Sequence, residues 1–195
     1  CAVRICRMLD LQRHNRLLIV GAGPIGLFTL QAALILGVRE IAVVDLNADR
    51  LAIARKIGAV TAQSVERLAA SFLPAGAGTG PQAFFDAAVD AVGRTATRNQ
   101  CIKAVRFGGK VVFSGLHEAD SALAVNTAIR NELALLGSFA YAREDFATAL
   151  MWIIGKRASL MNWTETAMLS DGAQCFENLI RQSGKMAKIV LRVQA

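Results

Sequence analysis

Hydrophobic positions along this chain form short unbroken runs, separated by longer stretches in which apolar residues recur at helical spacing. Short runs rich in valine, isoleucine and leucine are typical of parallel strands that are buried on both faces. We expect such strands at residues 17–20, 40–44, 59–62, 84–89, 110–114 and 132–136. The longer stretches predict helices at residues 1–9, 24–36, 48–57, 65–72 and 95–105. This alternation favours an α/β fold with a doubly wound, six-stranded parallel sheet and helices on both faces, built as a pseudo-repeat of two three-strand halves.

The first predicted strand runs directly into a glycine-rich turn. Gly21, Gly23 and Gly26 have the G-x-G-x-x-G spacing of a dinucleotide-binding turn. The first glycine permits a tight turn, the second lets a pyrophosphate approach the backbone, and the third lets the following helix pack closely on the strand. Pro24 suits the first position of that helix, whose unpaired N–H groups attract phosphate. The turn therefore predicts a Rossmann-type nucleotide-binding fold.

The second predicted strand ends in an acid, Asp45, which follows Gly26 at nearly the spacing expected of a ribose-binding carboxylate. Its two oxygens can accept both hydroxyls of the adenosine ribose, and its charge would repel a 2′-phosphate. Leu46 stands where an arginine could have bound such a phosphate, so the pattern favours NAD over NADP. The alternative is that Asp45 only helps to cap the helix at 48–57.

Residues 143–195 depart from the strand–helix alternation. We expect a helix at 144–154, another from Asp171 or Gly172 to residue 182, and a strand at 187–193. Trp152 and Trp163, in or near this tail, can pack against a partner domain. We interpret residues 1–16 as a helical lead-in, 17–142 as the nucleotide-binding domain and 143–195 as a tail. Residues 74–81, rich in glycine and proline, predict a surface loop.

Composition narrows the class of protein. Hydrophobic residues make up 54% of the 195-residue chain and charged residues 19%, which excludes a disordered protein. The net charge is +7, but the basic residues are scattered without aromatic residues between them, so we expect no nucleic-acid partner. The helix at 24–36 is too short to span a bilayer, and no signal peptide is recognisable, so we expect no membrane partner.

The four cysteines form no C-x-x-C pair. This pattern favours reduced thiols in a cytoplasmic protein over a disulfide framework or a metal site. The chain opens on Cys1 within an apparently helical phrase, and we interpret it as a piece of a longer protein.

The order of motifs resembles the carboxyl-terminal part of the medium-chain, zinc-dependent alcohol and polyol dehydrogenases, over essentially the whole chain. The turn has the Gly-Ala-Gly-Pro-Ile-Gly form of the alcohol and polyol branch rather than that of the quinone reductases. The matching phrases are Gly21–Leu27, Val44–Leu51 with Ala54 and Ile57–Ala59, Asp86–Gly93, Gly108–Val112, Gly137–Phe139 and Gly184–Leu191.

The resemblance implies roles for individual residues around bound NAD. Gly21, Gly23, Pro24 and Gly26 would hold the pyrophosphate, with Ile25 behind the nicotinamide. The adenosine half would meet Asp45 and Arg50, and its side of the crevice would be bordered by Ala91, Val92 and Gly93. The nicotinamide half would contact the backbone of Ser114, Gly115 and Leu116, and that of Ser138 and Phe139. Lys188 would reach the pyrophosphate or, equally, be a solvated strand lysine.

The family's zinc ligands lie in a catalytic domain that precedes the cofactor domain, and its Gly-His-Glu motif is absent from this sequence. Neither His14 nor His117 has cysteine or glutamate at ligand spacing, so we expect no catalytic or metal-binding residue in this chain. We expect residues 1–16 and 143–195 to adjoin that catalytic domain.

We therefore expect the NAD-binding part of an oxidoreductase that transfers hydride from an alcohol to NAD, inactive by itself, whose full-length parent binds zinc. A stand-alone NAD-binding regulatory module and an adenosylmethionine-dependent methyltransferase are the alternatives. The resemblance and an edge strand at 132–136 imply a homo-oligomer, such as a dimer. Several classes of small alcohol substrate stay open.

Overall fold

The computed structural model describes residues 1–13, 15–72, 84–159, 163–181 and 188–193. Its larger sheet has six parallel strands in the order β3-β2-β1-β4-β5-β6. The strands are β1 (Arg16–Val20), β2 (Glu40–Val44), β3 (Val60–Ala62), β4 (Phe85–Asp90), β5 (Val105–Phe113) and β6 (Ala134–Gly137). This order confirms the predicted doubly wound sheet, with the two three-strand halves meeting between β1 and β4. It also confirms an edge strand, β6.

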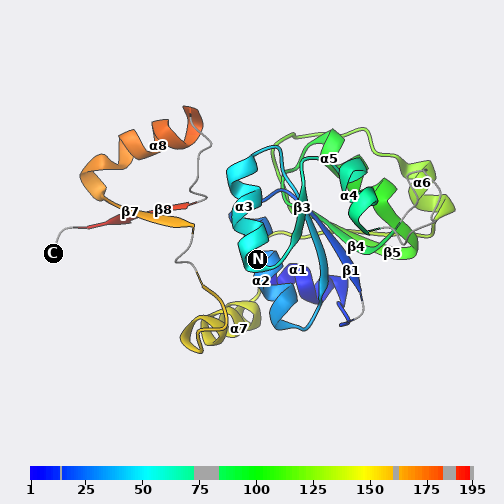
Figure 1. The fold of residues 1–195 in the computed structure, drawn as a ribbon, viewed down its shortest axis with the longest axis horizontal. Helices are drawn as coiled ribbons and strands as arrows, with labels where there is room; N and C mark the ends of the chain where they lie inside the picture. The colour runs from blue at the N-terminus through cyan, green and yellow to red at the C-terminus, as the bar shows by residue number, and fades with distance from the viewer. Residues whose placement is uncertain (14, 73–83, 160–162, 182–187, 194–195) are drawn as a thin grey trace.

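Helices cover both faces of this sheet (Figure 1). They are α1 (Ala2–Leu9), α2 (Pro24–Ile35), α3 (Ala48–Ile57), α4 (Val65–Phe72), α5 (Thr95–Ala104) and α6 (Val125–Arg130). Successive residues of a strand point to opposite faces, and β1 shows this directly. Leu17 and Ile19 belong to the hydrophobic core that includes α1, α2 and α3, whereas Leu18 and Val20 belong to the core that includes α4 and α5. None of the described helices is long and apolar enough to cross a membrane.

The remaining elements are α7 (Arg143–Ile154), β7 (Thr164–Met168), a 3-10 turn η1 (Leu169–Asp171), α8 (Gly172–Arg181) and β8 (Lys188–Arg192). We call β7, η1, α8 and β8 the small unit. Its two strands are parallel and pair Thr164 with Lys188 and Met168 with Arg192. Figure 1 shows the small unit to one side of the six-stranded sheet, beyond α3, with α7 below it.

Several sequence-based expectations need correction. The strand expected at 110–114 starts earlier, because the chain leaves α5 directly into β5 at Val105 and the pairing with β4 shifts register between Phe85 and Ala87. The strand expected at 132–136 starts at Ala134, since Glu132 has a φ of 48° that a strand does not accommodate. The elements α6 and β7 were not expected, because both are short and at least half of the residues in each are polar. The predicted loop at 74–81 lies outside the described residues.

The expectation that Trp163 packs against a partner domain is wrong. Its side chain is 1% exposed and belongs to the same hydrophobic core as β1 and α2. The ring meets Phe28 of α2 edge-on, with the ring centroids 4.7 Å apart. Trp152 of α7 also packs against this core. The segment around α7 therefore packs against the six-stranded sheet and its helix α2.

Candidate cofactor site

The carboxyl ends of five neighbouring strands lie level with one another. Val20 pairs with both Val44 and Asp90, Asp90 pairs with Phe113, and Phe113 pairs with Gly137. Each of these is the last residue of its strand, so the segments that follow all begin where the strands end, at the side of the sheet that we call the strand-end edge. In open α/β sheets, ligands bind outside this edge. It brings together most of the predicted cofactor residues: Gly21–Gly26, Asp45, Ala91–Gly93, Ser114–Leu116 and Ser138–Phe139.

The three glycines of the turn after β1 meet three different requirements. Gly21 has a φ of +106°, and its N–H donates to the Val44 carbonyl at 2.7 Å, which ties the turn to β2. A Cβ at Gly26 would overlap the carbonyl oxygen of Gly21, so only glycine lets α2 begin this close to β1. Apart from Gly23 itself and its two chain neighbours, no atom of the described residues would lie within 4 Å of a Cβ at Gly23. The second glycine therefore faces open space, which fits a close approach by a ligand.

The amino end of α2 adjoins that open space. Pro24 occupies its first turn, and the first intrahelical bond runs from the Leu27 N–H to the Gly23 carbonyl at 2.9 Å. The N–H groups of Ile25 and Gly26 therefore have no acceptor within the helix, and the helix dipole makes this end partly positive. This arrangement suits a phosphate.

Asp45 joins the glycine turn to the segment that leads into α3. One carboxylate oxygen accepts the Ala22 N–H at 2.7 Å, and the other accepts the Asn47 N–H at 2.8 Å. A carboxylate has about four acceptor positions, so both oxygens keep capacity for ribose hydroxyls. The side-chain cap of α3 is Asn47, which accepts the Arg50 N–H at 3.0 Å. The cap interpretation of Asp45 is therefore unsupported, because its neighbour fills that role.

Arg50, in the first turns of α3, carries a buried Nε that has no hydrogen-bond partner among the described residues. Leaving a buried donor unpaired costs about 1–3 kcal/mol. An acceptor supplied by a ligand beside α3 would remove that cost, which fits the predicted position near the adenine.

Asp90 shapes the turn after β4, and its side chain is completely buried. The carboxylate accepts the N–H of Val92 at 3.1 Å and that of Gly93 at 3.0 Å. The backbone carbonyl of Asp90 accepts the N–H groups of Ser114 at 2.9 Å and Gly115 at 3.0 Å. One residue thus fixes the backbone of both strand-end segments.

Gly93 and Gly115 lie backbone to backbone. Gly93 has a φ of +90°, and a Cβ on either glycine would overlap backbone atoms around the other. This close approach holds the turn after β4 against the loop after β5.

Three predicted residues lie differently from the rest. Leu116 and Phe139 expose their side chains, so only their backbones are placed at the edge of the sheet. Lys188 opens β8 of the small unit and is exposed, so it does not belong to the strand ends of the larger sheet.

His117 is exposed, and its Nε2 lies 2.7 Å from the Arg94 guanidinium.

Burial raises the pKa of the Cys6 thiol to about 12 and raises that of Cys101 well above its ordinary value, so neither is a ready nucleophile. Within the ranges that the structure describes, no group of three or more His, Cys, Asp or Glu side chains could hold a metal ion. The described residues therefore offer no set of side chains that fits a zinc site.

Comparison with known sequences bears on this geometry. The sequence model described as "Zinc-binding dehydrogenase" matches residues 24–155, which is more than half of the chain. The chain belongs to the zinc-binding dehydrogenase family. It is 30% identical to the probable D-xylulose reductase A of Arthroderma otae over 97% of its own length and 54% of that protein's. It is 31% identical to the L-threonine 3-dehydrogenase of Idiomarina loihiensis over the same shares.

This member of the zinc-binding dehydrogenase family thus spans about half the length of the curated relatives it matches. Its fold is shared with acetophenone reductase from Geotrichum candidum, solved in complex with NAD, at a TM-score of 0.80 and 21% identity. That comparison covers 96% of this chain and 52% of the other. At this identity it shows the fold alone.

Within this family fold, sequence reasoning missed three residues that support the strand ends: Asp90, Arg98 and Glu118. Asp90 had a detectable signal, since it is an acid that ends an apolar strand just before a glycine turn. Glu118 accepts the N–H of Thr95 at 2.7 Å and its hydroxyl at 2.9 Å. The pKa of Glu118 is lowered, first of all by this backbone hydrogen bond. Nothing in the local pattern singled out Arg98 or Glu118.

Proposed function

We propose that this chain is the NAD-binding part of an alcohol or polyol dehydrogenase, and that the full-length parent is the active enzyme. The observation that carries the proposal is the strand-end edge, where a glycine turn open at Gly23 lies next to an acid, Asp45, that retains acceptor capacity. The matched relatives named as a D-xylulose reductase and an L-threonine dehydrogenase support a small alcohol as substrate. Bound NAD supplies the hydride acceptor for such a reaction.

In this proposal the chain's own residues bind and orient the dinucleotide. Unpaired N–H groups at the start of α2 hold the pyrophosphate, and Asp45 holds the adenosine ribose. The carboxylate of Asp45 disfavours a 2′-phosphate by charge repulsion. Arg50 lies beside the adenine. The segments Ala91–Gly93, Ser114–Leu116 and Ser138–Phe139 border the ring systems, and Ile25 packs behind the nicotinamide. Lys188 is retained only as a candidate for the pyrophosphate.

The division into residues 1–16, 17–142 and 143–195 remains part of the proposal. So does the expectation that the parent's zinc ligands lie outside this sequence, which is supported by the half-length match to the relatives. We also propose a cytoplasmic protein, because all four cysteines are free thiols and two of them, Cys6 and Cys101, are buried.

Calorimetric titration of the purified chain tests the cofactor. We expect NAD⁺ and NADH to bind, NADP⁺ to bind at least about tenfold more weakly, and adenosylmethionine not to bind. Asp45→Asn should weaken the binding of NADH by about tenfold and narrow the difference in affinity between NADH and NADPH. The matched control is Asp49→Asn, an exposed acid on α3. Equal affinity for NADH and NADPH in the wild-type chain contradicts the role of Asp45.

Activity is tested separately by following NADH absorbance with small alcohols and NAD⁺. We expect no turnover by the 195-residue chain. Measurable oxidation would contradict the proposal that this part lacks the catalytic groups.

A homo-oligomer formed through β6 is supported by the position of this strand at the edge of the sheet. Light scattering measures the mass in solution. A monomer at all concentrations tested removes this part of the proposal.

A further inference from the structure

The loop that follows β5 is held in place by side chains from the first turns of α5. Thr95 donates its N–H and its hydroxyl to the Glu118 carboxylate at 2.7 and 2.9 Å. Asn99 donates to the Ala122 carbonyl at 2.8 Å and accepts the Ala124 N–H at 2.7 Å. The conformation of residues 114–124 therefore depends on α5, which lies far from it in the sequence.

Arg98 lies at the centre of these contacts. Its Nη2 donates to the carbonyls of Gly115 at 3.2 Å and Glu118 at 3.4 Å, and its Nη1 donates to the Ser121 hydroxyl. Its Nε lies 3.8 Å from the Asp90 carboxylate. The Arg98 side chain is 12% exposed and that of Asp90 is 0% exposed. A planar guanidinium can meet all of these acceptors at once, which a lysine ammonium cannot.

This arginine connects the two segments that border the far side of the strand-end edge. The same Asp90 carboxylate holds the N–H groups of Val92 and Gly93. The Glu118 N–H donates to the Gly93 carbonyl at 2.8 Å, which joins the segments a second time. An interaction buried away from water is screened little, so the position of each segment fixes that of the other.

The order of the strands indicates which half of a dinucleotide these segments meet. The glycine turn follows β1, and Asp45 follows β2 on one side of it. The segments after β4 and β5 lie on the other side of β1. The Ala91–Gly93 segment is therefore separated from Asp45 by the glycine turn, which does not fit its expected place on the adenosine side. A pyrophosphate at the turn with its adenosine ribose at Asp45 directs the nicotinamide half toward β4 and β5.

We propose that Arg98 is a positioning residue that sets the Ser114–Glu118 backbone to receive the nicotinamide half of the cofactor. This inference rests on the NAD-binding function proposed above. Arg98 itself need not touch the ligand, since its donors already serve the loop. Its loss should therefore weaken the binding of ligands that carry the nicotinamide ring much more than the binding of ligands that lack this ring.

The experiment compares NADH with ADP-ribose, which lacks the nicotinamide ring, on the whole 195-residue chain. We expect Arg98→Met to raise the dissociation constant of NADH by about tenfold and that of ADP-ribose by less than about twofold. The matched control is Lys103→Met, an exposed cation at the other end of α5, which should leave both constants unchanged. The fluorescence emission of NADH gives a second readout. We expect binding to the wild-type chain to shift the emission wavelength from that of free NADH, and binding to Arg98→Met to leave it closer to the free value.

Arg98→Met leaves Asp90 without its cation and can compromise folding, so Arg98→Lys provides a second variant. It keeps the positive charge near Asp90 but cannot reach both loop carbonyls, so we expect a smaller change of the same kind, selective for NADH. Equal weakening of NADH and ADP-ribose, or no weakening of either, overturns the role of Arg98 and leaves the proposed function standing. A wild-type chain that binds neither ligand overturns both proposals.

Discussion

The two sheets of this molecule differ in how much of their surface the rest of the chain covers. In the six-stranded sheet, Leu17, Leu18 and Ile19 of β1 are fully buried, because helices pack on both faces. In the two-stranded sheet of the small unit, β8 alternates between exposed and half-buried positions, and Val190 is 45% exposed. A site that must hold a ligand in one geometry needs rigid support. The covered sheet provides that support.

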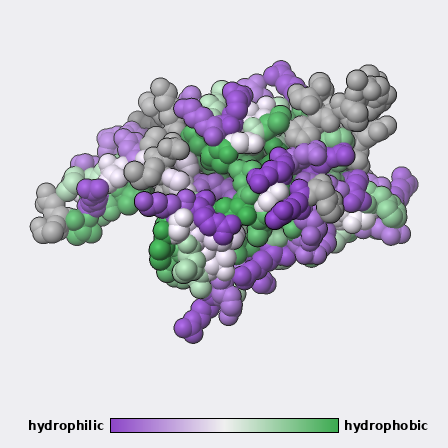
Figure 2. Space-filling model, turned by 60° about the horizontal axis from the view of Figure 1, so that its bottom comes forward, coloured by the Kyte–Doolittle hydropathy of each residue, from purple (hydrophilic) through white to green (hydrophobic). Residues whose placement is uncertain are grey.

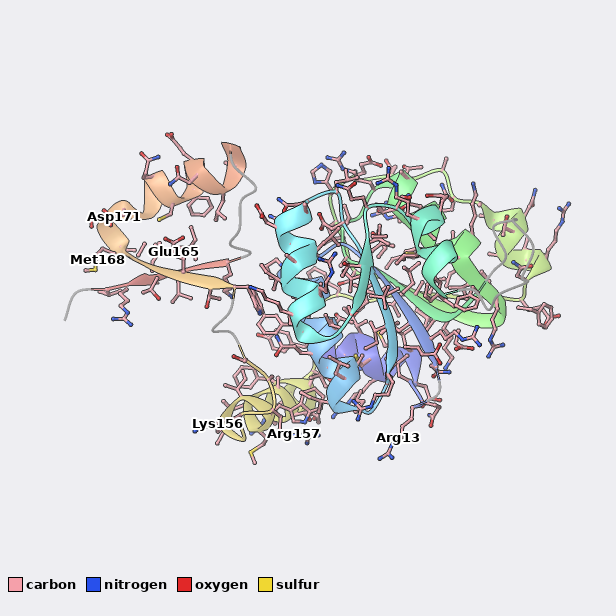
Figure 3. All side chains as sticks on the ribbon, in the orientation of Figure 1. Arg13, Lys156, Arg157, Glu165, Met168 and Asp171 are labelled. Carbon is pink, nitrogen blue, oxygen red and sulfur yellow. The ribbon has the colours of Figure 1, made fainter. Side chains whose placement is uncertain are left out.

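The helices show the same contrast. The α2 helix buries residues on all sides, whereas α8 exposes Phe176 by 67% and Ile180 by 80%. Figure 3 labels Glu165, Met168 and Asp171 in the small unit, which is drawn to one side of the larger sheet. The surface in Figure 2 shows hydrophobic residues among hydrophilic ones on the face to which α7 contributes. Exposed apolar residues on α7 include Leu150, Met151 and Ile154. Apolar surface is therefore exposed on α7 and the small unit, and also at the strand ends of the larger sheet, where Leu46, Leu116 and Phe139 are exposed.

Substitutions at two glycines near the strand ends of the six-stranded sheet should affect stability and cofactor binding differently. Gly93→Ala places a Cβ against the backbone of Gly115 at a φ of +90°, so we expect a loss of about 4 kcal/mol in the free energy of unfolding. Gly23→Ala places its Cβ in open space with an ordinary φ of −75°, so the free energy of unfolding should change by less than about 1 kcal/mol. The same Cβ should weaken the binding of NADH by about tenfold, because it fills the space in which we propose that the pyrophosphate binds.

Denaturant unfolding and NADH titration of both glycine variants check this pair. If Gly23→Ala binds NADH as tightly as the wild-type chain, the open space at Gly23 does not receive the cofactor. If Gly93→Ala keeps full stability, the two strand-end segments are not in close contact.

Truncation of one aliphatic residue in each sheet tests the contrast directly. Leu18→Ala should lower the free energy of unfolding by about 3 kcal/mol, because it leaves a cavity between β1 and the helices that cover it. Val190→Ala in β8 should cost less than about 1 kcal/mol, since nearly half of the side chain is already in water. Urea denaturation measures both. Equal costs would show that the small unit is as tightly packed as the larger sheet.

This contrast also explains how much of the fold could be predicted from sequence. A strand buried on both faces requires apolar residues at every position, so β1 and β2 stand out as continuous runs. The strand β7, Thr164–Met168, is short and half exposed, and its mixed sequence carries no comparable signal. Trp163 was misplaced for a related reason, because an aromatic residue in a polar segment does not reveal that it packs on Phe28.

The candidate site divides in the same way. The placement of the glycine turn and Asp45 side by side at the strand ends could be predicted, because it follows from residue types at fixed spacing within one continuous segment. Their roles in binding stay predictions. Arg98 and Glu118 could not be assigned, because their contacts join α5 to the loop that follows β5. Residue type alone does not show which of many arginines turns inward; that depends on how the loop folds over the helix.

An acid at the opposite end of the larger sheet gives a pH-dependent test. Burial raises the pKa of Asp86, but hydrogen bonds from the Arg16 N–H and the Arg106 guanidinium outweigh it, so the net pKa is lowered. Because the pKa of Asp86 is lower in the folded state, its ionised carboxylate stabilises the fold fully at pH values above the unfolded pKa of about 4. This stabilisation is lost as the pH falls below the unfolded pKa and through the folded one. Asp86→Asn should cost about 1–2 kcal/mol at neutral pH.

Unfolding of Asp86→Asn and the wild-type chain at several pH values checks this expectation. The difference between the two should shrink as the pH falls toward 3, below the unfolded pKa of about 4. The control is Asp120→Asn, an exposed acid, which should follow the wild-type curve. A constant difference across the pH range contradicts a role for the ionised carboxylate.

The smallest effect is expected on the exposed face of α8. Phe176→Ser removes an aromatic side chain that is 67% exposed, so the free energy of unfolding should change by less than about 0.5 kcal/mol. The variant should also be less prone to self-association, because exposed apolar surface promotes contact between molecules. Denaturation at two protein concentrations, with light scattering, separates these effects. If Phe176→Ser lowers stability only at high concentration, this face is covered by a second copy, and the small unit is then stabilised by association rather than by packing within the chain.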